Sequence, residues 1–85
     1  MKKRYSVLCY IINGYEDVKE IGEKDPEAEY VLVTDDKTLK STTWDVVYDE
    51  NLLSMRSTFD KCYAIRFNLF KYCHAPLCIY IDANI

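Results

Sequence analysis

Apolar runs separated by polar segments divide the 85-residue chain into predicted strands and one long helical region. The strand-like runs are 4–12, 30–34, 44–48 and 77–81. The first run is rich in β-branched and aromatic residues, and the unbroken apolar run 77–81 fits a strand that a sheet buries on both faces. Asp45 interrupts the third run and indicates an edge strand. Because helical residues separate the last two runs, we expect a crossover, and so an α/β domain: a mostly parallel four-stranded sheet with helices packed on it.

The helical pattern is strongest between residues 52 and 72, where apolar side chains recur at three- and four-residue steps. The predicted apolar stripe consists of Phe59, Cys62, Tyr63, Phe67 and Phe70. Ser57 or Thr58 can cap the start of this helix, and Asn68 can interrupt and restart it. A weaker helical spacing in residues 15–25 predicts one or two helical turns after the first strand.

The composition indicates a packed domain and narrows the classes of partner. With 49% hydrophobic residues, two Gly and two Pro, the chain is neither disordered nor of low complexity. A net charge of −3 argues against binding nucleic acid through a basic face. No apolar stretch approaches the ~18 residues of a membrane span. The four cysteines form no C-x-x-C pair, so we expect reduced thiols in a cytoplasmic protein.

Oxygen-bearing side chains follow the last apolar run and are candidate metal ligands. Asp82 ends the run and Asn84 lies two residues on, so both side chains point the same way if the backbone stays extended. Ligands of parallel α/β sheets bind outside the carboxyl ends of the strands. Two hard oxygen ligands there suit Mg²⁺ or Mn²⁺ holding a diphosphate, although the same residues can simply end a strand in a turn.

Other polar residues in comparable positions are candidates for nucleotide contacts. Asp35 and Asp36 end the second strand, where a cation, a ribose hydroxyl or a backbone amide can hold one of the two adjacent carboxylates. Alternatively, one of them caps the next turn. The 13–14 turn after the first strand is either a nucleotide-contact loop or a solvated connector. Arg66 and Lys71 lie beside the helical stripe, in a ligand site or on a solvated basic face.

Four segments, in their order and spacing, resemble the N-terminal half of GT-A-type glycosyltransferase-like proteins. They are INGYED (12–17), VTDDKTLKSTTWDVVY (33–48), RFNLFKY (66–72) and CIYIDANI (78–85). The family includes bacterial capsule and surface-polysaccharide enzymes and a plant group related to mucilage and alkaline ceramidase. The resemblance covers nearly the whole chain, and the block from T-D-D to the tryptophan and the final I-D-x-x-I are its most specific parts.

The resemblance implies the Rossmann-like half of a GT-A fold, which binds a nucleotide sugar. By position, Asp82 looks like the first acid of the family's D-x-D-like motif for Mn²⁺ or Mg²⁺. Asn84 stands where many relatives have a second acid or a small polar residue, and its neutral amide oxygen is a weaker ligand than a carboxylate. Arg66 and Lys71 match a basic element near the donor site, with Leu69 in place of the expected proline. The residues that resemble the base- and ribose-binding parts are Ile12, Asn13, Gly14, Tyr15, Asp35 and Asp36.

The implied activity is transfer of a sugar from a nucleotide diphosphate donor in surface-polysaccharide synthesis, with the metal neutralising charge on the leaving diphosphate. The resemblance stops at the end of the sequence, directly after the metal motif. We therefore expect residues 1–85 to form a single partial donor-binding domain that lacks the acceptor half and is inactive alone. The last strand would then have an unpaired edge and uncovered apolar faces, which favours a homo-oligomer.

Two hypotheses from other functional classes compete with the glycosyltransferase interpretation. In the first, the chain is a non-catalytic interaction or structural module that uses the same half-fold. In the second, it is a receiver-like signalling domain, because acidic residues end several strands. A receiver places its acidic pair after the first strand, whereas that strand ends here in Asn13 and Gly14.

Overall fold

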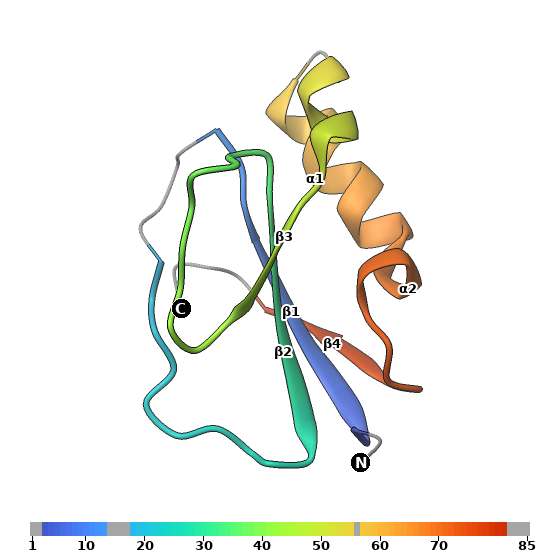
Figure 1. Ribbon diagram of the computed structural model, residues 1–85. Helices are drawn as coiled ribbons and strands as arrows, with labels where there is room; N and C mark the ends of the chain where they lie inside the picture. Colours follow the sequence, from blue (N-terminus) through green and yellow to red (C-terminus); the bar gives the residue numbers. More distant parts are fainter. Residues whose placement is uncertain (1–2, 14–17, 56, 82–85) are drawn as a thin grey trace.

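All strands that the structure describes run in one direction within one sheet (Figure 1). The computed structural model describes residues 3–13, 18–55 and 57–81. Its strands are β1 (Tyr5–Ile11), β2 (Ala28–Thr34), β3 (Asp45–Tyr48) and β4 (Cys78–Tyr80). The order across the sheet is β3-β2-β1-β4, so β1 pairs with both β2 and β4. The predicted α/β class with parallel strands is confirmed, and β3 occupies an edge, as Asp45 indicates.

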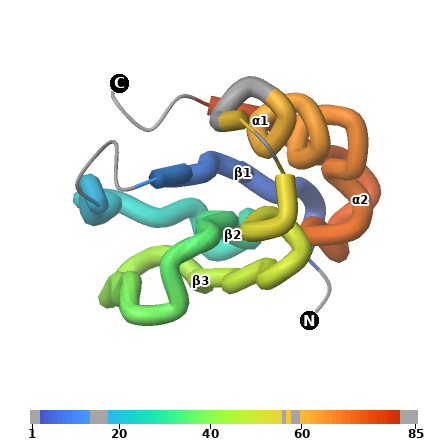
Figure 2. The backbone as a smooth tube through the Cα atoms, turned by 90° about the horizontal axis from the view of Figure 1, so that it is seen from above, coloured from blue at the N-terminus to red at the C-terminus, as the bar shows by residue number. Residues whose placement is uncertain are grey.

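Helical segments between β3 and β4 cover one face of the sheet (Figure 2). They are the 3₁₀ helix η1 (Glu50–Ser54), α1 (Thr58–Phe67) and the short α2 (Leu69–Tyr72). Ser57 caps α1 by accepting from the amide of Asp60, and Asn68 separates α1 from α2, as the sequence predicts. Alternate residues of β1 and β2 meet these helices in the main core, which contains Leu8, Ile12, Val31, Val33, Leu52, Ile65, Tyr72 and Cys73.

The opposite face is covered by described residues of the two connections, 18–27 between β1 and β2 and 35–44 between β2 and β3. The apolar residues gathered there are Cys9, Ile11, Leu32 and Trp44, with Val7, Val18, Ile21, Tyr30, Leu39 and Ile81 partly buried around them. The segments also bind each other, since the Trp44 indole donates to Lys19 O over 2.9 Å. Glu20 accepts from Thr42 N over 2.6 Å and from the hydroxyls of Ser41 and Thr42. Side chains thus satisfy two backbone groups of these irregular segments, Lys19 O and Thr42 N, which have no helical hydrogen bonds.

The apolar stripe predicted for the long helix is wrong in most of its members. Tyr63, Phe67 and Phe70 are exposed, with relative accessibilities of 52%, 69% and 69%. The buried face instead contains Lys61 and Ile65, one helical turn apart, which are 7% and 0% exposed. A lysine on the buried face makes that face look polar in the sequence, so periodicity selects the wrong side of the helix.

Two further expectations differ from the structure. Residues 18–25 contain no helix, whereas the pattern predicts helical turns within 15–25. In the described sheet β4 forms the second edge, and Ile79 is 44% exposed, so this strand is not buried on both faces as its apolar run predicts. Its open edge does match the unpaired edge expected for the last strand.

Two neighbouring leucines of η1 differ in burial, so substituting them tests whether η1 packs against the main core. Leu52 is 0% exposed, while Leu53 beside it is 57% exposed. We expect Leu52→Ala to lower the free energy of unfolding by about 2–5 kcal/mol, because truncation leaves a cavity, and Leu53→Ala to change it by less than about 0.5 kcal/mol. Urea unfolding followed by circular dichroism measures both. Equal losses in the two variants would contradict this packing.

Glu20 makes the packing of the connecting segments depend on pH. Hydrogen bonds from Ser41 and then Thr42 lower the pKa of its carboxyl from 4.5 to about 2. A carboxyl with a lowered folded-state pKa stabilises the fold above its unfolded pKa, and this contribution disappears as the pH falls from 4.5 toward about 2. Glu20→Gln should therefore reduce the fall of the thermal midpoint in this window. Glu23→Gln, at an exposed carboxyl of the same segment, is the control and should keep the wild-type profile.

Candidate functional site

A buried ion pair lies where β1 and β2 end. Asp35 follows β2 directly, and Lys61 Nζ reaches to 2.6 Å from its Oδ2, with the two side chains 6% and 9% exposed. Asn13, in the turn after β1, completes the group. Its side-chain carbonyl accepts from Lys61 Nζ over 2.8 Å, and its backbone amide donates to Asp35 Oδ1 over 3.1 Å. These three residues, here named the strand-end triad, join three segments that are far apart in the sequence.

Local backbone geometry brings the triad together. Asn13 has a φ of 58°, in the left-handed region that asparagine tolerates better than most residues. The chain leaves β3 at the same edge and enters η1 and then α1, so α1 begins beside this edge (Figure 1, top of the view). Lys61 therefore projects from the first turns of α1, and the positive end of the helix dipole faces the strand ends.

Hydrogen bonds to Asn13 make the burial of this ion pair tolerable. Taking two charges out of water costs several kcal/mol per ion, and attraction offsets this only if further hydrogen bonds satisfy both groups. Asn13 supplies one such bond to each member of the pair. Within the described ranges, no buried side-chain nitrogen or oxygen lacks a hydrogen-bond partner. The strand-end triad is thus a satisfied polar cluster at the border of an apolar core.

A second strand-end carboxylate, Asp49 after β3, is also paired with a lysine. Its Oδ2 accepts from Lys71 Nζ and from the Tyr72 hydroxyl, each over 2.8 Å. Its Oδ1 accepts from the amide of Asn51 over 3.0 Å and so caps η1. Burial alone would raise the pKa of Asp49, but the hydrogen bonds from Lys71 and Tyr72 outweigh burial and lower this pKa.

Arg66 contacts neither of these carboxylates and lies against aromatic residues beside β4. Its Nη2 donates to the Tyr80 hydroxyl over 3.4 Å, and its Cζ lies 4.9 Å from the centre of the Tyr80 ring. The Tyr80 ring stacks on Tyr10 at 5.4 Å. The hydrogen bond with Tyr80 raises the pKa of Arg66. No carboxylate of the described residues forms an ion pair with Arg66, so its charge is not neutralised by them.

The structure separates the other residues that the sequence singled out. Asp36 Oδ1 accepts from the hydroxyl and the amide of Thr38 over 2.6 and 2.9 Å, which lowers the pKa of Asp36. Asp36 therefore holds a turn, as the alternative interpretation has it. Ile12 is 2% exposed in the main core, where its side chain cannot reach a ligand. The remaining predicted site residues, Gly14, Tyr15, Asp82 and Asn84, lie outside the described residues.

The described residues do not fit a divalent-cation site. Among residues 3–13, 18–55 and 57–81, no group of three or more His, Cys, Asp or Glu side chains could hold a metal ion. Asp35 and Asp49 each bind a lysine already, and that positive charge opposes a second cation. The expectation of Mn²⁺ or Mg²⁺ therefore depends on Asp82 and Asn84.

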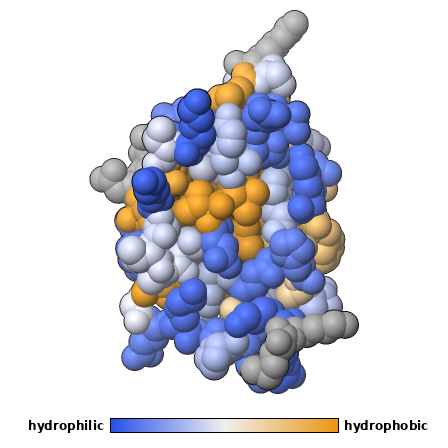
Figure 3. All heavy atoms as spheres, viewed as in Figure 1, coloured by the Kyte–Doolittle hydropathy of each residue, from blue (hydrophilic) through white to orange (hydrophobic). Residues whose placement is uncertain are grey.

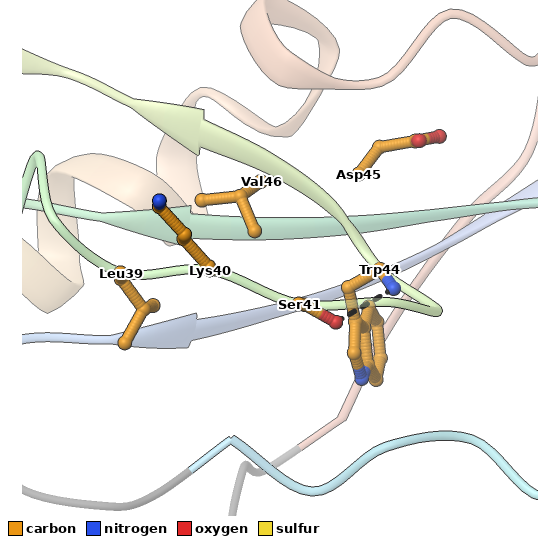
Figure 4. A pocket seen from close by; sticks show the side chains of 6 residues that line it. All are labelled: Leu39, Lys40, Ser41, Trp44, Asp45 and Val46. Atoms are coloured by element: carbon orange, nitrogen blue, oxygen red, sulfur yellow. Dashed lines mark hydrogen bonds between the residues drawn. The ribbon is translucent and has the colours of Figure 1, made fainter.

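A shallow hollow lies at the other end of β3, away from Asp49 (Figure 4). It measures about 430 Å³ and is lined by Leu39, Lys40, Ser41, Trp44, Asp45 and Val46. Hydrophobic residues gather in the middle of the face shown in Figure 3, between hydrophilic residues. The side chains of Lys40 and Asp45 extend in different directions in Figure 4, and the Trp44 amide donates to Ser41 Oγ over 2.9 Å. The hollow therefore gathers no set of groups for catalysis or metal binding.

Sequence reasoning did not single out Lys61 or Asp49, although each carries a signal. Asp49 follows a strand directly, as Asp35 does. Lys61 lies four residues before Ile65, and a lysine on a buried helical face needs a carboxylate partner. The position of Lys61 was not recognised because the helical face that contains Phe67 is the more apolar one in the sequence.

Breaking the strand-end triad tests how it is stabilised. Asp35→Asn leaves the buried Lys61 charge without its counter-ion, and we expect a loss of about 3–5 kcal/mol in the free energy of unfolding. Adding Lys61→Met removes the stranded charge and should recover most of this loss. Glu27→Gln is the control, because it breaks the exposed Arg4–Glu27 pair and should cost less than about 1 kcal/mol. A double variant no more stable than Asp35→Asn would overturn this account of the pair.

The functional assignment has to come from the chemistry of the site itself. Among the described residues, no helix is both long enough and apolar enough to cross a membrane. No protein-family model matches the chain, and no curated protein or solved structure matches it significantly.

Proposed function

We propose that the carboxyl edge of this sheet binds a nucleotide diphosphate sugar, as the donor-binding part of a glycosyltransferase-like protein. In this proposal the nucleoside lies against Asn13 and Asp35, and the diphosphate lies toward the carboxyl end of β4. The proposal depends on one observation: the backbone amide of Asn13 donates to the Asp35 carboxylate, which joins the turn after β1 to the acidic end of β2. Strand order, hydrogen-bonding capacity and charge each support it.

The strand order favours a ligand at this edge. In open parallel sheets, ligands bind outside the carboxyl ends of the strands, at the place where the strand order reverses. Here the chain moves from β1 to β2 and β3 on one side and then returns to β4 on the other side of β1. β1 is therefore the strand beside which such a crevice forms, and Asn13 belongs to the turn that leaves it.

Asp35 has the chemistry to hold a ribose. It occupies the place at which dinucleotide-binding sheets use an acidic residue to accept from a ribose hydroxyl. Each carboxylate oxygen can accept more than one hydrogen bond. In the described part of the chain, Oδ1 accepts from Asn13 and Oδ2 accepts from Lys61. Each oxygen thus retains acceptor capacity, while Lys61 and Asn13 fix the orientation of the carboxylate.

The charges near the strand ends are compatible with a diphosphate. Asp35 and Asp49 would repel it, but each is neutralised by a lysine. The amino end of α1 adds a partial positive charge at the same edge. Arg66, beside β4, is a cation that no described carboxylate neutralises. Mn²⁺ or Mg²⁺ at Asp82 and Asn84 is a separate part of the proposal, and it has its own variant below.

A second candidate, from a different class, is a non-catalytic module that associates with itself. Tyr63 and Phe67 stack at 4.2 Å on the outer side of α1, and Phe70 on α2 is equally exposed. Ile79 is exposed on the open edge of β4. Large apolar side chains gathered on a surface favour contact with another protein surface. This module needs no nucleotide.

Calorimetric titration with UDP, alone and with Mn²⁺, tests the donor site. We expect saturable binding with a dissociation constant below about 1 mM, and tighter binding with Mn²⁺. Asn13→Gly keeps the left-handed backbone but removes the side chain that orients Lys61, so it should weaken UDP binding about fivefold or more. Asp82→Ala should abolish the effect of Mn²⁺ and leave metal-free binding unchanged.

Asp45→Ala is the matched control, because Asp45 is an exposed acid at the opposite end of the strands. It should change neither constant. UDP binding that Mn²⁺ does not affect would retain the nucleotide site and reject the metal site. No saturable binding under either condition would reject the donor site, and a concentration-dependent dimer in sedimentation would then favour the self-associating module.

A further inference from the structure

Two cysteines that are separated by four residues meet at the junction between α2 and β4. Cys73 Sγ and Cys78 Sγ lie 2.8 Å apart, whereas a disulfide bond measures about 2.05 Å. Both thiols are free in this structure. A shift of less than about 1 Å would therefore bring the two sulfur atoms to bonding distance.

The backbone on both sides of this contact is held in place. Cys73 ends α2, and its amide donates to Leu69 O over 3.0 Å. Cys78 begins β4 and pairs with Ser6 of β1. The segment between them is fixed as well, since the Ala75 amide donates to Ser6 Oγ over 3.3 Å. The two sulfur atoms are thus brought together by the fold and not by the motion of a loose loop.

The two thiols differ in access to solvent. Cys73 is 4% exposed, whereas Cys78 is only partly buried. Burial, and then the hydrogen bond with Cys78, raises the pKa of Cys73 to about 12, which keeps this thiol protonated. An oxidant in solution therefore meets Cys78 first. Cys73 needs no access of its own, because its partner sulfur is already beside it.

We propose that Cys73 and Cys78 form a reversible disulfide in exchange with a small-molecule disulfide such as oxidised glutathione. The Cys78 thiolate attacks one glutathione sulfur, which forms a mixed disulfide and releases one glutathione thiolate. The Cys73 sulfur then attacks Cys78 Sγ, and the second glutathione leaves as a thiolate that takes up the Cys73 proton. Two protein thiols are oxidised, and one glutathione disulfide is reduced to two thiols.

The other cysteines lack this arrangement and serve as internal references. Cys9 lies on the opposite face of the sheet, in the cluster around Trp44, and burial raises its pKa to about 12. Cys62 is partly buried beside the main core, and no second cysteine sulfur lies within hydrogen-bond reach of it among the described residues. Cys62 can accept a glutathione but cannot resolve it into an internal disulfide.

Trypsin separates these cysteines cleanly, so peptide mass spectrometry can follow each. Cleavage at lysine and arginine places Cys73 and Cys78 together on peptide 72–85, Cys62 on 62–66 and Cys9 on 5–19. The native chain is treated with oxidised glutathione, then denatured, alkylated and digested. We expect peptide 72–85 to lose both alkylation sites and the mass of two hydrogens about tenfold faster than peptide 62–66 gains a glutathione. Dithiothreitol should reverse the change.

Variants and stability complete the test. Cys78→Ser, at the less buried position, should remove the internal disulfide and leave Cys73 alkylated, while Cys62→Ala should leave the rate for peptide 72–85 unchanged. The oxidised chain should melt several degrees higher than the reduced chain, because the bridge restricts the unfolded state. The proposal is overturned if peptide 72–85 stays doubly alkylated, or carries two glutathiones, while peptide 62–66 reacts. A lower melting temperature after oxidation would also overturn it.

Discussion

The buried contact between Lys61 and Asp35 holds the two layers of this fold in register. The sheet can pack against a helix in several positions if only apolar side chains meet, because such contacts have no direction. A charge pair at 2.6 Å has a direction and a strict distance. Once Lys61 is paired, Ile65 must enter the core one turn later, and the outer side of α1 must carry Tyr63 and Phe67. The exposure of these aromatic residues thus follows from the position of one lysine.

The strands were predictable from the sequence, and the helical face was not, for related physical reasons. A strand in a parallel sheet shows itself as an unbroken apolar run, and β1 and β2 have such runs. The buried face of a helix is recognised in a sequence by its apolar residues. This rule fails when the buried face contains a charged residue. Lys61 is such a charge, and its carboxylate partner lies 26 residues away in the sequence. Only the folded arrangement of β2 against α1 shows that the lysine is satisfied.

The candidate site was predictable in part. The sequence places Asn13 and Asp35 after successive strands, and parallel pairing of β1 with β2 then brings these ends together. What the sequence could not supply is the partner of each acid. Asp35, Asp36 and Asp49 look alike as strand-end residues, yet one binds a buried lysine, one holds its own turn and one caps η1. These outcomes depend on which helical side chains reach over the strand ends, and that depends on the packing of α1 and α2.

The ion pairs of Asp35 and Asp49 also determine which part of the proposed site can attract a metal ion. With Asp35 and Asp49 neutralised by lysines, the ends of β2 and β3 have little attraction for a divalent cation but no longer repel a diphosphate. Any attraction for a metal must then come from the carboxyl end of β4, from which the sequence continues to Asp82. β4 pairs with β1 over three residues, the shortest pairing in the described sheet. The backbone bonds that flank β4, the contacts of Tyr80 with Arg66 and Tyr10, and the sulfur contact at its start also hold it. The strand with most to do in the proposed chemistry thus has the shortest pairing in the described sheet, and a covalent bond at Cys78 would add to its attachment.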